Sequence, residues 1–169
     1  FTMGIGEFGY GLPNSALERE KLEFAVYLSE NFDGRILRDV IVVDYLAYVH
    51  LTSEDNNFKE FKSLRGKNPY PVEGGTTGGE RYESGKIVRL SVNGKTMEEL
   101  VTNGESLGLK YIGVPEKGSY FFPFIDILYY DEEKYPYMKK VFDSDEMGYK
   151  EFKIKVFEID YKKFHDLGD

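Results

Sequence analysis

The chain has 169 residues and a net charge of −8, a size that suits one domain. Its apolar share of 41% and aromatic share of 16% allow a sizeable core and exclude a disordered chain. The acidic charge argues against a nucleic-acid partner, because phosphate neutralisation needs clustered basic residues. Cysteine is absent and there are two histidines, which excludes disulfides and a zinc site built on three histidines.

Composition also indicates whether the chain spans a membrane and what kind of source it comes from. No apolar run reaches the roughly 18 residues that span a bilayer. Tryptophan is absent and charged residues make up 31% of the chain, which favours a heat-adapted source. The chain begins at Phe1 rather than at methionine, so we expect a fragment or a processed product that a signal peptide or an anchor preceded.

The organisation of the chain indicates one domain with a long internal loop. Residues 1–13 are rich in glycine and predict a lead-in or linker, so the domain covers residues 14–169. Residues 40–51 are ambiguous, because residues 40–43 favour a strand while residues 45–51 also fit a buried helix, and residues 53–64 predict a short amphipathic helix. Residues 65–85 are rich in glycine and proline and predict a loop, and loops of this length are often functional or mobile.

The first predicted elements are a helix and a strand. Ser15 and Glu18 have the spacing of a capping box, in which side chains satisfy the free N–H groups of a helix start. We expect this helix to end between Asn31 and Gly34, because glycine is a common helix-ending residue. Residues 35–39 then predict a short strand.

The middle of the chain predicts a strand–helix–strand unit. Residues 86–92 form the first strand, and Thr96 with Glu99 gives a second capping box. The helix ends at Gly108, and residues 109–114 form the second strand. Such a unit requires parallel strands with a crossover helix. We therefore predict an α/β fold, in which a small, mostly parallel sheet is flanked by helices.

The last third predicts a helix followed by a strand. Residues 121–130 are highly apolar but short. Residues 131–141 predict a helix, since their three opening acidic residues would complement the helix dipole. Residues 150–161 predict the last strand, with a change of hydrophobic phase at Phe157 that indicates a bulge or burial on both faces.

Two patterns suggest ligand-binding residues. In α/β sheets ligands bind beyond the carboxyl ends of the strands, which places Asp39 and Asn93 at a candidate groove. Aromatic rings stack on sugar faces but also fill cores. The tyrosines that are candidates for a ligand or glycan surface are Tyr129, Tyr130, Tyr135 and Tyr137.

One pattern suggests a metal. Asp143 and Asp145 form D-x-D, and two carboxylates one residue apart can share Mg²⁺ or Mn²⁺. The same residues also make ordinary turns. The glycine runs at residues 4–11 and 74–79 lack the context of a dinucleotide loop or a phosphate loop, and no nucleophile elbow occurs.

Two blocks of the sequence resemble archaeal multi-spanning membrane glycosyltransferases. In these proteins a helix that follows the last membrane spans leads into E-N-x-x-G-R-I-L and the first strand of an exposed domain. The matching residues here are Leu28, Glu30, Asn31, Gly34, Arg35, Ile36 and Leu37. Residues 107–112, 134–144 and 153–161 resemble the strand entry, the helix and the final strand of the same domain.

The resemblance implies a soluble domain held at the extracytoplasmic face by membrane helices missing from this chain. The parent enzymes use lipid-linked sugars, and their catalytic carboxylates, with any Mg²⁺ or Mn²⁺, lie in the missing part. The chain has no tryptophan, so it lacks the W-W-D-Y-G motif of the archaeal oligosaccharyltransferases, and no catalytic residue transfers to it.

Three functions remain after the sequence analysis. The first is a non-catalytic domain that helps a membrane glycosyltransferase to position its acceptor or glycan, with the missing transmembrane region and a lipid-linked sugar or acceptor as partners and no cofactor of its own. The second is a free-standing soluble module that binds proteins. The third is a metal-dependent sugar-nucleotide transferase that uses Asp143 and Asp145.

Overall fold

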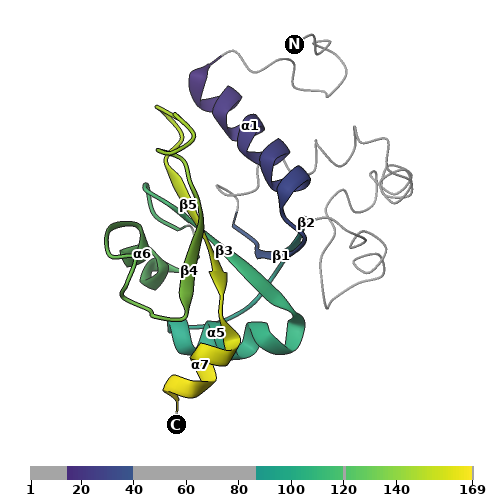
Figure 1. The fold of residues 1–169 in the computed structure, drawn as a ribbon, viewed down its shortest axis with the longest axis vertical. Coiled ribbons are helices and arrows are strands. Elements are labelled where there is room, and N and C mark those ends of the chain that lie inside the picture. The colour runs from purple at the N-terminus through teal and green to yellow at the C-terminus, as the bar shows by residue number, and fades with distance from the viewer. Residues whose placement is uncertain (1–14, 40–86, 120, 169) are drawn as a thin grey trace, which may run out of the picture.

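The computed structural model describes residues 15–39, 87–119 and 121–168 (Figure 1). The predicted lead-in, the elements expected between residues 40 and 64, and the loop 65–85 lie outside the described residues.

The first helix, α1, covers Ala16–Asn31 and begins as the capping spacing predicts. The side-chain oxygen of Ser15 accepts a hydrogen bond of 3.1 Å from the N–H of Glu18. The N–H of Phe32 closes the helix by donating to the carbonyl of Leu28. Strand β1, Gly34–Leu37, follows directly, so the predicted helix and strand are both confirmed.

The predicted strand–helix–strand unit is also confirmed. It consists of β2 (Ile87–Leu90), α5 (Met97–Leu107) and β3 (Leu109–Pro115). The Thr96 hydroxyl caps α5 by accepting from the N–H of Glu99 at 3.1 Å. Gly108 ends the helix with a φ of 82°, a left-handed conformation that favours glycine.

The C-terminal part differs from the prediction. It contains the short helices η2 (Pro123–Ile125) and α6 (Ile127–Tyr130), the strands β4 (Met138–Asp143) and β5 (Ile154–Ile159), and the helix α7 (Tyr161–Leu167).

The helix predicted for residues 131–141 is wrong, because Pro136 offers no N–H to a helix and Met138 onward pairs with β5 instead. The bulge lies in β4, between Lys140 and Phe142. In β5, the adjacent Val156 and Phe157 are both buried, so burial on both faces is confirmed.

The five strands form one sheet in the order β2-β1-β3-β5-β4. Strand β1 is parallel to β2 and to β3, and β5 is antiparallel to β3 and to β4. Four strands therefore run in one direction and β5 runs in the other, which agrees with the predicted α/β class. The crossover through α5 passes over β1, because β1 lies between β2 and β3.

Each face of the sheet has its own core. Helix α1 packs on one face, where Phe24 and Leu28 meet Ile36, Phe142 and Val156. Helices α5, α6 and α7 pack on the other face, and Figure 1 shows them apart from α1. Within the described part of the chain, no helix is both long enough and apolar enough to cross a membrane.

Candidate functional site

A groove of about 590 Å³ lies where β1 and β2 end, and we call it the carboxyl-end groove. The two strands are parallel, so the residues that follow them reach the same edge of the sheet. The N–H of Arg38 donates to the carbonyl of Leu90 at 2.8 Å and ties the two ends together. The charged, amide and aromatic side chains that line the groove come from Arg38, Asn93, Lys95, Glu99, Phe121 and Phe122.

The turn that forms one wall of this groove is fixed to α5. The Asn103 amide donates to the carbonyl of Asn93 at 2.8 Å. A Cβ added at Gly94 would lie 2.7 Å from the backbone of Leu100, so only glycine lets the turn approach the helix this closely. The wall is thus set by backbone geometry.

The sequence-predicted Asp39 lies beside this groove as a buried anchor. Its carboxylate accepts a hydrogen bond of 3.0 Å from the Ser119 hydroxyl, and the Ser119 oxygen in turn accepts from the N–H of Phe122. The N–H of Ser119 donates to the Asp126 carboxylate at 2.7 Å. Asp39 therefore positions the loop after β3, whereas Asn93 lines the groove itself.

The lining of the carboxyl-end groove offers both an aromatic surface and polar side chains. Phe121 is 54% exposed and offers an aromatic surface. Arg38 and Lys95 are donors, Glu99 is an acceptor, and the Asn93 amide is both. Sequence reasoning missed Arg38 and Phe121; it placed Arg38 inside a strand over residues 35–39, whereas β1 ends at Leu37.

Each carboxylate of the D-x-D pattern forms an ion pair with a lysine. Asp143 accepts from Lys140 at 2.9 Å and from the N–H of Asp145 at 3.0 Å, and Asp145 accepts from Lys153 at 2.6 Å. Burial alone would raise the pKa of Asp143, but Lys140 and the Asp145 N–H lower it overall. Among the described residues, no three His, Cys, Asp or Glu side chains are grouped to hold a metal ion.

The structure separates the four candidate tyrosines. Tyr130 is 76% exposed on α6, while Tyr129 is buried. Lys155 lies 4.5 Å from the Tyr129 ring centroid and donates to the Tyr129 carbonyl and to Glu132. Glu132, predicted to open a helix, instead forms ion pairs with Lys140 and Lys155. Tyr135 and Tyr137 line a different groove, at α7.

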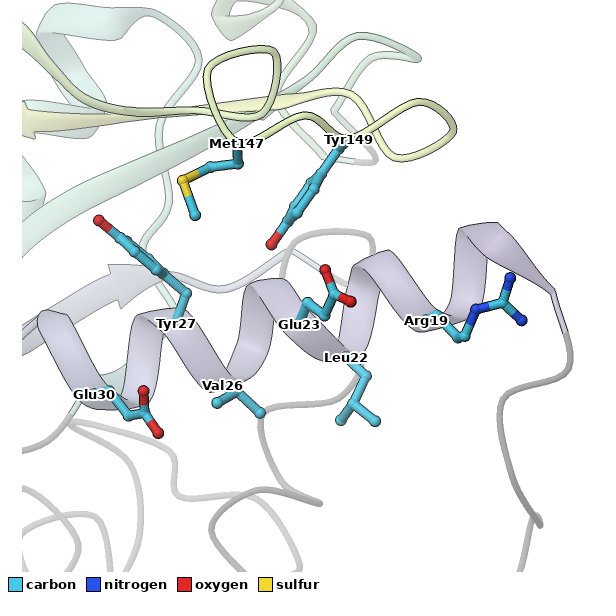
Figure 2. A pocket seen from close by; sticks show the side chains of 8 residues that line it. All are labelled: Arg19, Leu22, Glu23, Val26, Tyr27, Glu30, Met147 and Tyr149. Atoms are coloured by element: carbon cyan, nitrogen blue, oxygen red, sulfur yellow. The ribbon is translucent and has the colours of Figure 1, made fainter. Parts of the chain in front are cut away.

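A third groove, of about 520 Å³, runs along α1 and is called the α1 groove. Figure 2 shows Tyr27 and Glu23 of α1 facing Met147 and Tyr149 of the turn between β4 and β5. Burial, and secondarily the charge of Glu23, raises the pKa of Tyr149 to about 12, so its hydroxyl remains protonated at neutral pH. The surface of this groove is more apolar than that of the carboxyl-end groove.

Comparison of the chain with protein-family models, with curated proteins and with solved structures gives no match in any of the three. The proposed function therefore rests on the geometry of the grooves.

Proposed function

We propose that the chain is a non-catalytic, extracytoplasmic domain of a membrane-anchored glycosyltransferase that uses lipid-linked sugars. In this proposal the carboxyl-end groove holds the acceptor or the glycan. The transmembrane region of the same polypeptide carries the chemistry, together with any Mg²⁺ or Mn²⁺.

The observation that supports this proposal most is the composition of the carboxyl-end groove. It combines the exposed ring of Phe121 with the polar side chains of Arg38, Asn93 and Glu99 at the carboxyl ends of parallel strands. This edge of the sheet is where α/β folds place their ligands. An aromatic surface beside paired donors and acceptors matches a sugar, which has an apolar ring face and a rim of hydroxyl groups.

The ion pairs of the D-x-D pattern favour a non-catalytic role. A metal-dependent transferase would need Asp143 and Asp145 to release Lys140 and Lys153 before they could bind a cation. Titration with Mn²⁺ followed by calorimetry tests this rival. Heat at a one-to-one ratio, lost in Asp143→Asn, would favour the transferase, and no heat at millimolar metal would remove it.

Two experiments test the proposal itself. Source cells are fractionated and probed with an antibody to this domain. We expect a band well above 19.5 kDa that only detergent extracts, and a soluble band near 19.5 kDa would contradict membrane anchoring. Binding of a neutral oligosaccharide, mannotriose, is then measured by calorimetry.

The matched variants for mannotriose binding are Phe121→Ala in the groove and Ile127→Ala on α6. Both side chains are large, apolar and exposed, so neither change should unfold the protein. We expect Phe121→Ala alone to weaken binding, by roughly fivefold for one lost stacking contact. Equal weakening by both variants would show that the carboxyl-end groove is not the site.

The second candidate function is a protein-binding module, which the α1 groove favours. Met147 is 44% exposed there, beside Tyr27 and Tyr149, and exposed apolar side chains in a groove suit a protein partner. A stable stoichiometric complex isolated from native extract without detergent, and lost in Met147→Asp, would favour this function over the first.

A further inference from the structure

The groove at α7, called the tyrosine groove, has a volume of about 650 Å³. It lies between the start of α5, the turn that precedes β4, and α7, and it shares no lining residue with the carboxyl-end groove. The side chains that matter for its chemistry come from Glu98, Lys134, Tyr135, Tyr137, Phe164 and His165.

Tyr137 is the unusual residue of this groove. Its side chain is 5% exposed, and its buried hydroxyl has no hydrogen-bond partner among the residues that the structure describes. By contrast, the Tyr161 hydroxyl donates a hydrogen bond to the Leu109 carbonyl. A buried polar group without a partner destabilises a fold, so its presence calls for a functional explanation.

Ring contacts and a backbone hydrogen bond position Tyr137. Its ring lies 4.9 Å from the Phe164 ring in an edge-to-face arrangement and 5.9 Å from the Tyr135 ring. Its carbonyl accepts a hydrogen bond of 2.8 Å from the N–H of Asp160, which fixes the backbone. The hydroxyl is therefore held in place at the groove.

The other residues that line the tyrosine groove add charged and hydrogen-bonding groups to it. Burial raises the pKa of Tyr135 and of Tyr137, and the negative charge of Glu98 raises both further, so Glu98 acts on both phenols. His165 is already engaged, since its Nε2 lies 2.8 Å from the Glu105 carboxylate. The groove thus offers one carboxylate, one ammonium group from Lys134, and protonated phenols beside aromatic walls.

We propose that the tyrosine groove is a second binding site, for a neutral polyhydroxylated ligand such as a hexose unit, whose hydroxyl group pairs with the Tyr137 hydroxyl. The opposite charges of Glu98 and Lys134 leave no net preference for an ion, while together they supply the acceptor and the donor that neighbouring sugar hydroxyls need. The Tyr137 hydroxyl is covered, so binding requires a small shift of the partly exposed Tyr135.

This inference uses only the side chains of the tyrosine groove and does not depend on the proposed function. The two can therefore be tested separately in one experiment. Glucose, glucosamine and glucuronate, which share a ring and differ in charge, are titrated into the isotope-labelled protein. Backbone amide shifts at Lys134, Tyr135, Tyr137 and residues 164–168 report the tyrosine groove, and shifts at residues 93–95 report the carboxyl-end groove.

We expect glucose to shift the amides of the tyrosine groove and glucuronate to bind no more tightly than glucose. Tyr137→Phe should weaken glucose binding there by roughly fivefold, the effect of one hydrogen bond, and leave the melting temperature unchanged or higher. Tyr161→Phe, the matched control, removes a paired hydroxyl and should lower the melting temperature without changing glucose binding.

Three results would overturn the inference: no glucose-dependent shift at the tyrosine groove, wild-type affinity in Tyr137→Phe, or tighter binding of either charged sugar than of glucose. A shift at residues 93–95 alone would support the proposed function while rejecting this second site.

Discussion

The two faces of the sheet are covered in different ways. Among the described elements, α1 is the helix that covers one face, and it contributes Phe24 and Leu28 to a core rich in aromatic rings. The other face is shared by α5, α6 and α7, and its core is formed mainly by aliphatic side chains. Within the described ranges, the contacts of one face are therefore concentrated in one helix, while the other face distributes its contacts over several short helices.

The side chain of Glu20 attaches α1 to the backbone of another segment. The Glu20 carboxylate accepts hydrogen bonds from the backbone N–H groups of Lys150, Glu151 and Phe152, at 2.8 to 3.1 Å. It thereby joins the first half of the helix to the chain segment that enters β5. On the opposite face, α7 has no buried residue and rests on its partly buried Tyr161 and Phe164.

The largest loss of stability should follow removal of the Phe24 side chain from α1. Phe24 is 1% exposed and packs against Phe142 at 5.1 Å and Phe152 at 5.4 Å between ring centroids. Phe24→Ala should lower the free energy of unfolding by about 3–5 kcal/mol. Chemical denaturation measures the change. The control, Phe164→Ala on the other face, should cost only about 1–2 kcal/mol, and equal losses would refute the contrast between the faces.

A smaller, pH-dependent effect should follow loss of the Glu20 attachment. Burial alone would raise the pKa of Glu20, but the three N–H groups lower it overall from its ordinary value of 4.5. A lowered pKa in the folded protein adds stability above the unfolded value, and that stability disappears as the pH falls through the folded value.

Glu20→Gln should therefore cost about 1–2 kcal/mol at pH 7, and the difference from the wild type should shrink below about pH 4.5. Thermal unfolding from pH 7 to pH 3 measures it. Glu30→Gln changes the charge of the same helix equally and should have little effect. A constant difference across the pH range would rule out the role given to the Glu20 carboxylate.

The smallest effect should come from the cap of α7. The Asp160 carboxylate accepts from the N–H of Lys163 at 3.0 Å. Asp160→Ala should cost at most about 1 kcal/mol and should fray α7 without loosening the sheet. Amide hydrogen exchange should show faster exchange in α7 and unchanged exchange in β3 and β5. Faster exchange throughout would mean that α7 is as essential as α1.

Local signals predicted the described elements from α1 to β3 well. The caps at Ser15 and Thr96 and the left-handed Gly108 depend on neighbouring residues alone, so the sequence reveals them. The helix expected at residues 131–141 failed because β4 owes its conformation to pairing with β5. That pairing is tertiary, and it overrides a helical pattern of acidic and apolar residues.

The grooves were predictable only in part. Asn93 was found because a strand end marks a ligand edge, but the burial of Asp39 depends on Ser119, which lies 80 residues away along the chain. The unpaired hydroxyl of Tyr137 results from the way α5, α7 and the turn before β4 meet. No spacing of residues reveals such a missing partner.

The order of strands also sets the order in which the protein can assemble. Strands β4 and β5 are consecutive, are joined by residues 144–153 and pair as neighbours, so they can meet early, at a modest cost in loop closure. Strand β1 instead pairs Gly34 with Ile87 and Arg35 with Leu109, and both contacts close long stretches of chain. Folding should therefore proceed from the C-terminal hairpin toward β1, at a rate limited by the parallel edge.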